Sequence, residues 1–99
     1  MVQIKVVNRT QGADLTDKVR VYLRTTEALL VASPDGRKLS QDSIWLTGRI
    51  NEWVYHLNDT TLVMKLIPSA GTITFVFATA GKYSGTVFND LQGILDQYQ

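Results

Sequence analysis

Apolar residues alternate with polar ones along most of this chain, and a period of two is typical of β-strands that bury one face. Val2, Ile4 and Val6 show the pattern near the N-terminus, and Leu62 and Met64 show it again later. Strands with this spacing constrain the fold to a sheet with an inner and an outer side. The pattern and its neighbouring turn residues predict seven strands, over residues 2–6, 18–24, 27–32, 37–40, 51–57, 61–66 and 72–78.

The period changes near the C-terminus. Val87, Phe88, Leu91, Ile94 and Leu95 recur at helical spacing, and polar residues separate them. This spacing predicts an amphipathic helix that extends to residue 98, with Ser84 or Thr86 as its N-cap. We expect its apolar side to cover the sheet or to close one end of a barrel.

Turn residues separate the expected strands. Residues 10–14 read as a loop, residues 25–26 as a tight connection, and residues 33–36, 58–59 and 68–71 as turns. Short connections between sequential strands favour an antiparallel meander. We therefore expect one mainly β domain over residues 1–99, with a core that contains Ile4, Val6, Val21, Leu23, Leu30, Ile50, Leu62, Met64, Leu66, Phe75, Phe77, Phe88, Leu91 and Leu95.

Composition excludes several kinds of function. The chain has no cysteine, which removes disulfides, thiolate metal sites and cysteine nucleophiles. Ten basic and nine acidic residues give a net charge of +1, which argues against a nonspecific nucleic-acid binder. No apolar run is long enough for a transmembrane segment, and the N-terminal residues lack the pattern of a signal peptide.

The sequence contains no constellation of catalytic residues. His56 is the one histidine, and it falls within an expected strand. Asp14 and Asp17 lie in the expected loop region, where turn formation and solubility explain them most simply. We find no metal-binding spacing, nucleophile elbow or phosphate-binding glycine motif. We therefore expect a protein that is not an enzyme and needs no metal or other cofactor.

Aromatic and basic residues are the remaining candidates for a binding surface. Trp53 fits a core position, whereas Trp45 would be partly exposed if its neighbours Ile44 and Leu46 were buried. The basic candidates share an expected sheet face, which can hold an anion or can simply be solvated. They are Lys18, Arg20 and Arg24 on one expected strand, and Lys5 on the strand beside it.

Seven strands followed by one helix resemble the pleckstrin-homology superfold. Residues 21–36, VYLRTTEALLVASPDG, look like the hairpin of GRAM, GLUE and TFIIH-type domains of this superfold. Residues 62–67 and 72–77 are similar to the paired strands before the helix in the N-terminal domain of the TFIIH core subunit. The resemblance implies a seven-stranded antiparallel barrel capped by the C-terminal helix.

The TFIIH-type resemblance implies a protein-interaction module that binds acidic or extended peptides within a larger assembly for transcription. Lys65 matches a basic, outward-facing position of that family, and Thr61 and Val63 share its face. Arg49 is a second candidate cation, and an exposed strand edge can accept a peptide strand. The resemblance also implies a location inside the cell, in the nucleus.

Two other functions stay open. In membrane-targeting pleckstrin-homology domains, basic residues on the first two strands bind a phosphoinositide. Lys5, Lys18 and Arg20 match that spacing, and Arg24 extends the same row. The third possibility is a purely structural domain that holds a larger assembly together or self-associates through an edge strand.

Overall fold

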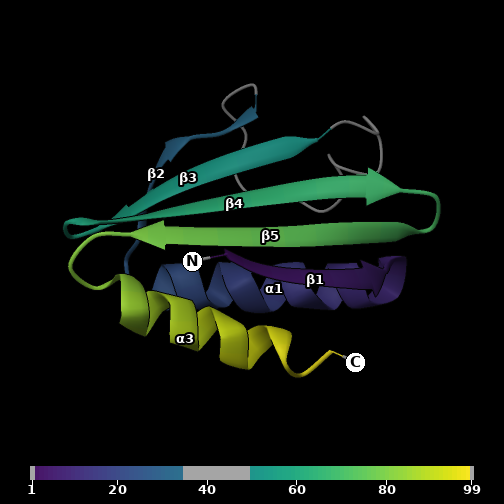
Figure 1. The fold of residues 1–99 in the computed structure, drawn as a ribbon. Coiled ribbons are helices and arrows are strands. Elements are labelled where there is room, and N and C mark those ends of the chain that lie inside the picture. Colours follow the sequence, from purple (N-terminus) through teal and green to yellow (C-terminus); the bar gives the residue numbers. More distant parts are fainter. Residues whose placement is uncertain (1, 35–49, 99) are drawn as a thin grey trace.

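The computed structural model describes residues 2–34 and 50–98, which form a sheet with two helices (Figure 1). The elements follow one another in the order strand, helix, four strands, helix. They are β1 (Val2–Asn8), α1 (Arg9–Thr25), β2 (Leu29–Ala32), β3 (Asn51–Leu57), β4 (Thr60–Ser69), β5 (Thr72–Ala80) and α3 (Ser84–Leu95).

Neighbouring strands of the sheet are all antiparallel, in the spatial order β1-β5-β4-β3-β2. β3, β4 and β5 form a meander. Its first turn lies at residues 58–59 as expected, and its second covers only residues 70–71 of the expected turn 68–71, because Pro68 and Ser69 belong to β4. Asn58 and Gly71 adopt positive φ angles of 55° and 74° in these turns, which suits residue types that tolerate left-handed backbone. β1 and β2 lie at opposite edges of the sheet, and α1 connects them.

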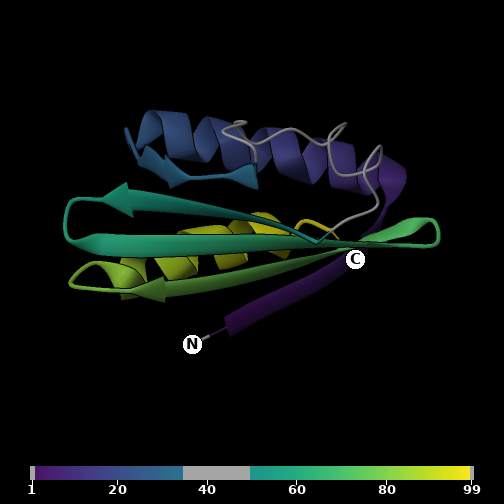
Figure 2. The same ribbon diagram turned by 90° about the horizontal axis from the view of Figure 1, so that it is seen from above.

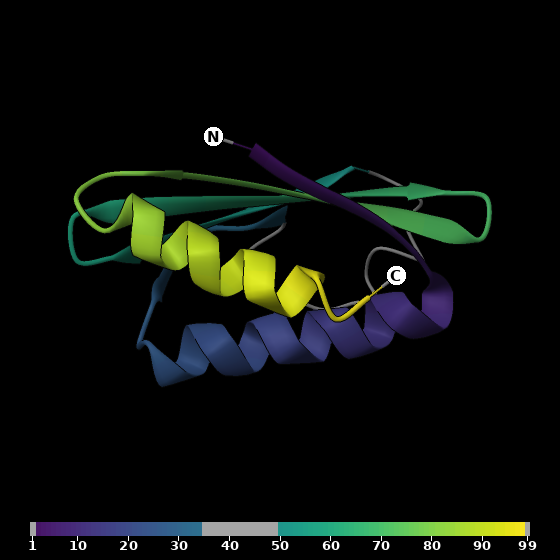
Figure 3. The ribbon, with the colours of Figure 1, turned by 60° about the horizontal axis from the view of Figure 1, so that its bottom comes forward.

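The two helices lie side by side on one face of the sheet (Figure 3). The strands direct alternate side chains to that face, where they meet the apolar sides of α1 and α3. Phe75 and Phe77 stack there with ring centroids 6.4 Å apart. The core consists of Val7, Leu15, Val19, Leu23, Trp53, Tyr55, Leu62, Met64, Leu66, Ile73, Phe75, Phe77, Val87, Leu91, Leu95 and Tyr98.

The structure confirms the coarse prediction of a mainly β chain with a C-terminal helix. In the described residues, however, the sheet has five strands, and neither seven strands nor barrel closure is seen. The expected strand over residues 37–40 lies outside the described residues, as do Trp45 and Arg49. The expected turn at residues 33–36 is described only as far as Pro34.

The prediction of a loop at residues 10–14 and a strand at residues 18–24 is wrong, because both belong to α1. Leu15, Val19 and Leu23 are spaced by four residues and lie on one side of this helix, where all three are buried. The Asn8 side chain starts the helix by accepting a hydrogen bond of 2.8 Å from the Gln11 N–H. In return, the Asn8 N–H donates to the Gln11 side-chain oxygen, which completes a capping box.

Four expected core residues are exposed instead. Ile4 and Val6 point away from the helices, and Val7 is the β1 residue that enters the core. Val21 lies on the outer side of α1, and Ile50 precedes β3 with 63% of its surface exposed. Of the others, Leu30 is partly buried against the core, and the rest are buried: Leu23, Leu62, Met64, Leu66, Phe75, Phe77, Phe88, Leu91 and Leu95.

The C-terminal helix begins and ends close to its expected limits. Tyr83 takes the N-cap position, so Ser84 is the first helical residue, and the helix ends at Leu95 before residue 98. Gly81 precedes it with φ at 127°, and a side chain there would collide with the backbone of Asp59. The Tyr83 N–H donates to Thr60 Oγ1 at 2.7 Å, which attaches the start of α3 to β4.

Replacing Val19 and Val21 separately with alanine distinguishes the helix from the strand expected from alternation. Val19→Ala should lower the free energy of unfolding by about 2 kcal/mol, because Val19 is completely buried. Val21→Ala should change it by no more than about 0.5 kcal/mol, because Val21 is 48% exposed on a helix. Urea unfolding followed by circular dichroism measures both, and equal losses would contradict the helical assignment.

Candidate interaction surface

The sheet face opposite α1 and α3 carries no helix of the described chain. Figure 2 views the chain from above, with α3 behind the strands. We call the sheet face opposite α1 and α3 the open face. Since side chains alternate along each strand, the residues of the open face are those between the core positions. They are Val2, Ile4 and Val6 of β1, Leu29 and Ala32 of β2, Glu52, Val54 and His56 of β3, Thr61, Val63, Lys65 and Ile67 of β4, and Thr74, Val76 and Ala78 of β5.

An unbroken apolar row crosses all five strands on the open face. The strand register places five residues as successive cross-strand neighbours: Val2, Ala78, Val63, Val54 and Ala32. Directly opposed side chains on adjacent strands are close enough to touch. The row is therefore one continuous apolar strip rather than a set of scattered residues.

Three exposed apolar residues gather at the β1 edge of the open face. Val2, Ile4 and Val6 have exposed fractions of 55%, 59% and 57%. Ile4 lies opposite Val76, and Val6 lies opposite Thr74. These β-branched side chains give a stiff surface, because their χ1 angles are restricted.

The charges on the open face are balanced. Lys65 and Glu52 occupy opposed positions on β4 and β3, and their charged atoms lie 3.9 Å apart. Both side chains are about half exposed, so this ion pair stabilises the fold by about 1 kcal/mol at most. The carboxylate reduces the attraction that Lys65 alone would exert on an acidic ligand.

The structure gathers three of the four residues expected to bind a peptide. Thr61, Val63 and Lys65 lie on the open face of β4, as their alternation with Leu62 and Met64 indicated. Arg49 lies outside the described residues. Trp53, assigned to the core from its strand position, is indeed buried. Sequence reasoning missed the apolar row itself, because no local pattern reveals that β1 pairs with β5.

The residues expected to bind an anion do not share one strand face. Lys18, Arg20 and Arg24 belong to α1, and Lys5 belongs to β1, on the face turned toward the helices. At 3.6 residues per turn, Lys18 and Arg20 point about 160° apart around the helix. Arg20 forms an ion pair of 2.7 Å with Asp17. The phosphoinositide hypothesis stays a prediction without a gathered cation cluster to support it.

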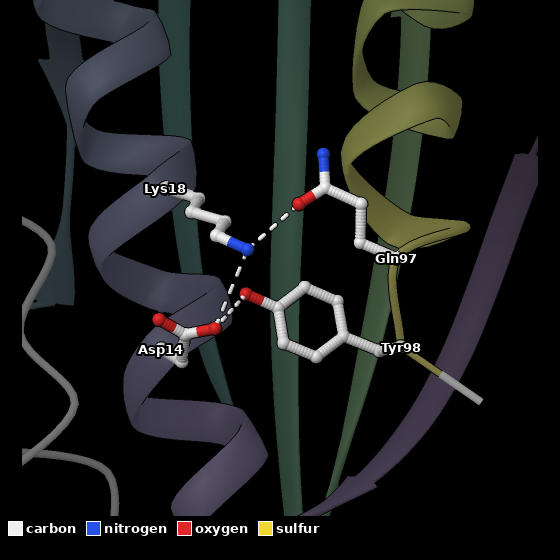
Figure 4. A network of polar contacts seen from close by, with 4 residues as sticks. All are labelled: Asp14, Lys18, Gln97 and Tyr98. Atoms are coloured by element: carbon white, nitrogen blue, oxygen red, sulfur yellow. Dashed lines mark hydrogen bonds and ion pairs between the residues drawn. The ribbon is translucent and has the colours of Figure 1, made fainter.

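Lys18 belongs instead to a polar network that joins α1 to the C-terminal residues (Figure 4). The Tyr98 hydroxyl donates a hydrogen bond of 2.6 Å to Asp14 Oδ2. Lys18 Nζ donates to Gln97 Oε1 at 2.7 Å and lies 3.5 Å from Asp14 Oδ2. The ammonium also lies 5.0 Å from the centre of the Tyr98 ring, within the range of a cation–π contact.

A second bond joins the helices further along, where the Tyr22 hydroxyl donates to Asp90 Oδ2 at 3.1 Å. The pKa of Tyr22 is raised to about 12, mainly because burial desolvates its hydroxyl and secondly because the Asp90 carboxylate lies beside it. An open groove of about 380 Å³ runs beside these contacts. It is lined by Asp17, Lys18, Val21, Tyr22, Ile94 and Gln97. The contacts among Asp14, Lys18, Gln97 and Tyr98, together with the bond between Tyr22 and Asp90, hold α3 against α1. We call this set of contacts the clasp.

The clasp makes stability depend on pH. The Tyr98 hydrogen bond is the main cause that lowers the pKa of Asp14 from 3.8. A carboxylate with a lowered pKa in the fold stabilises it above the unfolded-state pKa, and this contribution is lost as pH falls through the folded-state pKa.

Tyr98→Phe should therefore destabilise the chain at pH 7 and have a smaller effect below the unfolded-state pKa of Asp14. Urea unfolding of both proteins at pH 7 and in acid measures the difference. Tyr83→Phe serves as the control, because Tyr83 is 41% exposed and lies outside the clasp. A Tyr98→Phe effect that stays constant with pH would show that Asp14 does not depend on this hydrogen bond.

Comparisons with known proteins do not place this chain in a family. The chain matches no family model, no curated protein and no solved structure. No helix of the described residues is long and apolar enough to cross a membrane. Within residues 2–34 and 50–98, no group of three histidine, aspartate or glutamate side chains gathers in a way that could hold a metal ion.

Proposed function

We propose that this chain is a non-catalytic protein-interaction module that binds a partner protein through the open face of its sheet. The observation that carries this proposal is the apolar row across all five strands. Folding leaves this row without a covering helix in the described chain, while α1 and α3 cover the opposite face. A partner that covers the row would remove its apolar side chains from water.

The size of the open face fits a binding role. With strands about 4.8 Å apart and residues about 3.3 Å apart along each strand, five strands of about seven residues give a face of about 550 Å². Apolar patches of about 300–600 Å² are the largest on most monomers and are often binding sites. The open face as a whole is of this size, and its apolar part is smaller because Lys65, Glu52 and His56 interrupt it.

The balanced charges define the chemistry of the partner. Because Glu52 lies beside Lys65, the open face has no excess positive charge to select an acidic peptide. The stiff β-branched side chains favour a partner with a flat apolar surface. The pair formed by Lys65 and Glu52 favours a partner that has polar groups of both signs at the centre of that surface. The proposal therefore rests on this face and does not need the TFIIH-type resemblance.

Photo-crosslinking in cells that express the chain tests the proposal. A benzophenone amino acid replaces Thr74, which lies between Val6 and Ile67 on the open face. The same group replaces Arg24, which is exposed on α1. We expect one discrete adduct from position 74 and none of that mass from position 24. Equal labelling from both positions, or none from position 74, would contradict the proposal.

A lysine substitution tests the same surface by affinity. Val63→Lys should weaken binding of the crosslinked partner at least about tenfold, which corresponds to about 1.4 kcal/mol. The new ammonium would interrupt the apolar row and would be desolvated by the partner. Val21→Lys on α1 is the matched control and should leave the affinity unchanged. Circular dichroism verifies that both variants are folded, and equal affinities for the two would exclude the open face.

A further inference from the structure

β1 offers an outer edge that no described strand covers. It pairs with β5 on one side only and stands at the end of the sheet order. Such an edge presents unpaired backbone N–H and C=O groups that can bind another strand. This edge is a different surface from the β4 and β5 positions that test the proposed function, so the two can fail independently.

β1 lacks most of the devices that usually protect an edge strand. Proline, bulges, short length and charged residues are the common ones. β1 contains seven residues, has no proline, and follows an unbroken register with β5. Its one charged residue is Lys5. The opposite edge strand is better protected, because β2 has only four residues and its register shifts between Leu30 and Ala32.

The residue pattern of β1 is complementary to itself. Two antiparallel copies related by a twofold axis at Ile4 would place Ile4 opposite its own counterpart and Val2 opposite Val6 of the other copy. All these side chains lie on the open face and are more than half exposed. On the other face, Gln3 of one copy would lie opposite Lys5 of the other, where an amide oxygen can accept from the ammonium.

Neighbouring registers are less favourable. An axis at Lys5 would place the two Lys5 side chains directly opposite each other, and like charges in that position destabilise a sheet. A shift by one residue would direct the open face of one copy to the helix side of the other. The charge and face pattern of β1 therefore selects the register at Ile4.

We propose that two copies of this chain associate through antiparallel pairing of their β1 strands, centred on Ile4. The two sheets become one continuous sheet, and Val2, Ile4 and Val6 of both copies form one apolar strip along the junction. The contact pairs residues 2–6 of the two copies, a length of about 17 Å at about 3.3 Å per residue. An interface this small fits a reversible dimer with a dissociation constant in the micromolar range.

Sedimentation equilibrium of the full chain, at concentrations from about 1 μM to 1 mM around that expected affinity, tests the association. We expect a monomer–dimer equilibrium, and Ile4→Lys should weaken it at least tenfold, because two lysines would face each other across the axis. Val76→Lys is the matched control, because Val76 is the neighbour of Ile4 on the same face but lies away from the edge. It should leave the equilibrium unchanged.

A thiol test examines the register directly. The chain contains no cysteine, so Ile4→Cys introduces a single thiol that lies on the proposed axis. Mild oxidation should convert Ile4→Cys into a disulfide-linked dimer, and Val76→Cys should stay mostly monomeric. Gln3→Glu should tighten the dimer several-fold, because each copy gains an ion pair with Lys5 of the other.

The possible failures are distinguishable. A chain that stays monomeric at every concentration overturns the dimer and leaves the open-face function intact. A dimer that is weakened by Val76→Lys but not by Ile4→Lys overturns the edge pairing and places a second copy on the open face. If the chain is monomeric and the adducts from position 74 contain only a different protein, the dimer is overturned and the open face binds another partner.

Discussion

The packing of α1 and α3 against one face of the sheet is the constraint on which the rest of this structure depends. α1 must cross that face, since it connects β1 at one edge to β2 at the other. α3 returns along the same face and contacts β5. Two helices about 10 Å wide cover roughly the 24 Å width of a five-stranded sheet. Both helices therefore pack on one face of the sheet, and the described chain has no helix on the other face.

The clasp between the helices follows from the same arrangement. The helices must remain in contact to exclude water from the core. The hydrogen bonds from Tyr98 to Asp14 and from Tyr22 to Asp90 join α1 to α3 and the residues that follow it at two points. The bond between Tyr22 and Asp90 is exposed and the bond between Tyr98 and Asp14 is partly buried, so water competes more strongly with the first than with the second. Burial of Leu15, Val19 and Leu91 supplies most of the association.

Local patterns predicted the later half of the sheet well and the N-terminal third poorly. In β4 and β5, strong alternation and clear turns leave one interpretation, and the structure confirms it. In α1, Val19, Val21 and Leu23 alternate as in a strand, yet Val19 and Leu23 are also four residues apart as in a helix. The capping residues Asn8 and Gln11 were the signal that could have decided between them.

Alternation in β1 predicted two faces but not which one would be buried. The sequence predicts that Ile4 and Val6 of the more apolar side enter the core. In the structure Val7 of the other side is buried instead, and Gln3 and Lys5 beside it are partly buried. That outcome depends on the pairing of β1 with β5, a contact between residues about seventy positions apart in the sequence. The part of the candidate surface within β4 was accessible to sequence reasoning, and the row across strands was not.

The inverted polarity of β1 bears directly on its role. A strand whose more apolar side faces away from the core loses burial that the opposite orientation would have provided, about 25 cal/mol for each Å². Val7 and the Asn8 cap fix this orientation, because they commit the chain to enter α1 on the helix side of the sheet. The exposed valines and isoleucine therefore contribute little to folding, and substitutions there should change association while leaving the core intact. That separation makes the edge and the open face testable as binding surfaces in a chain this small.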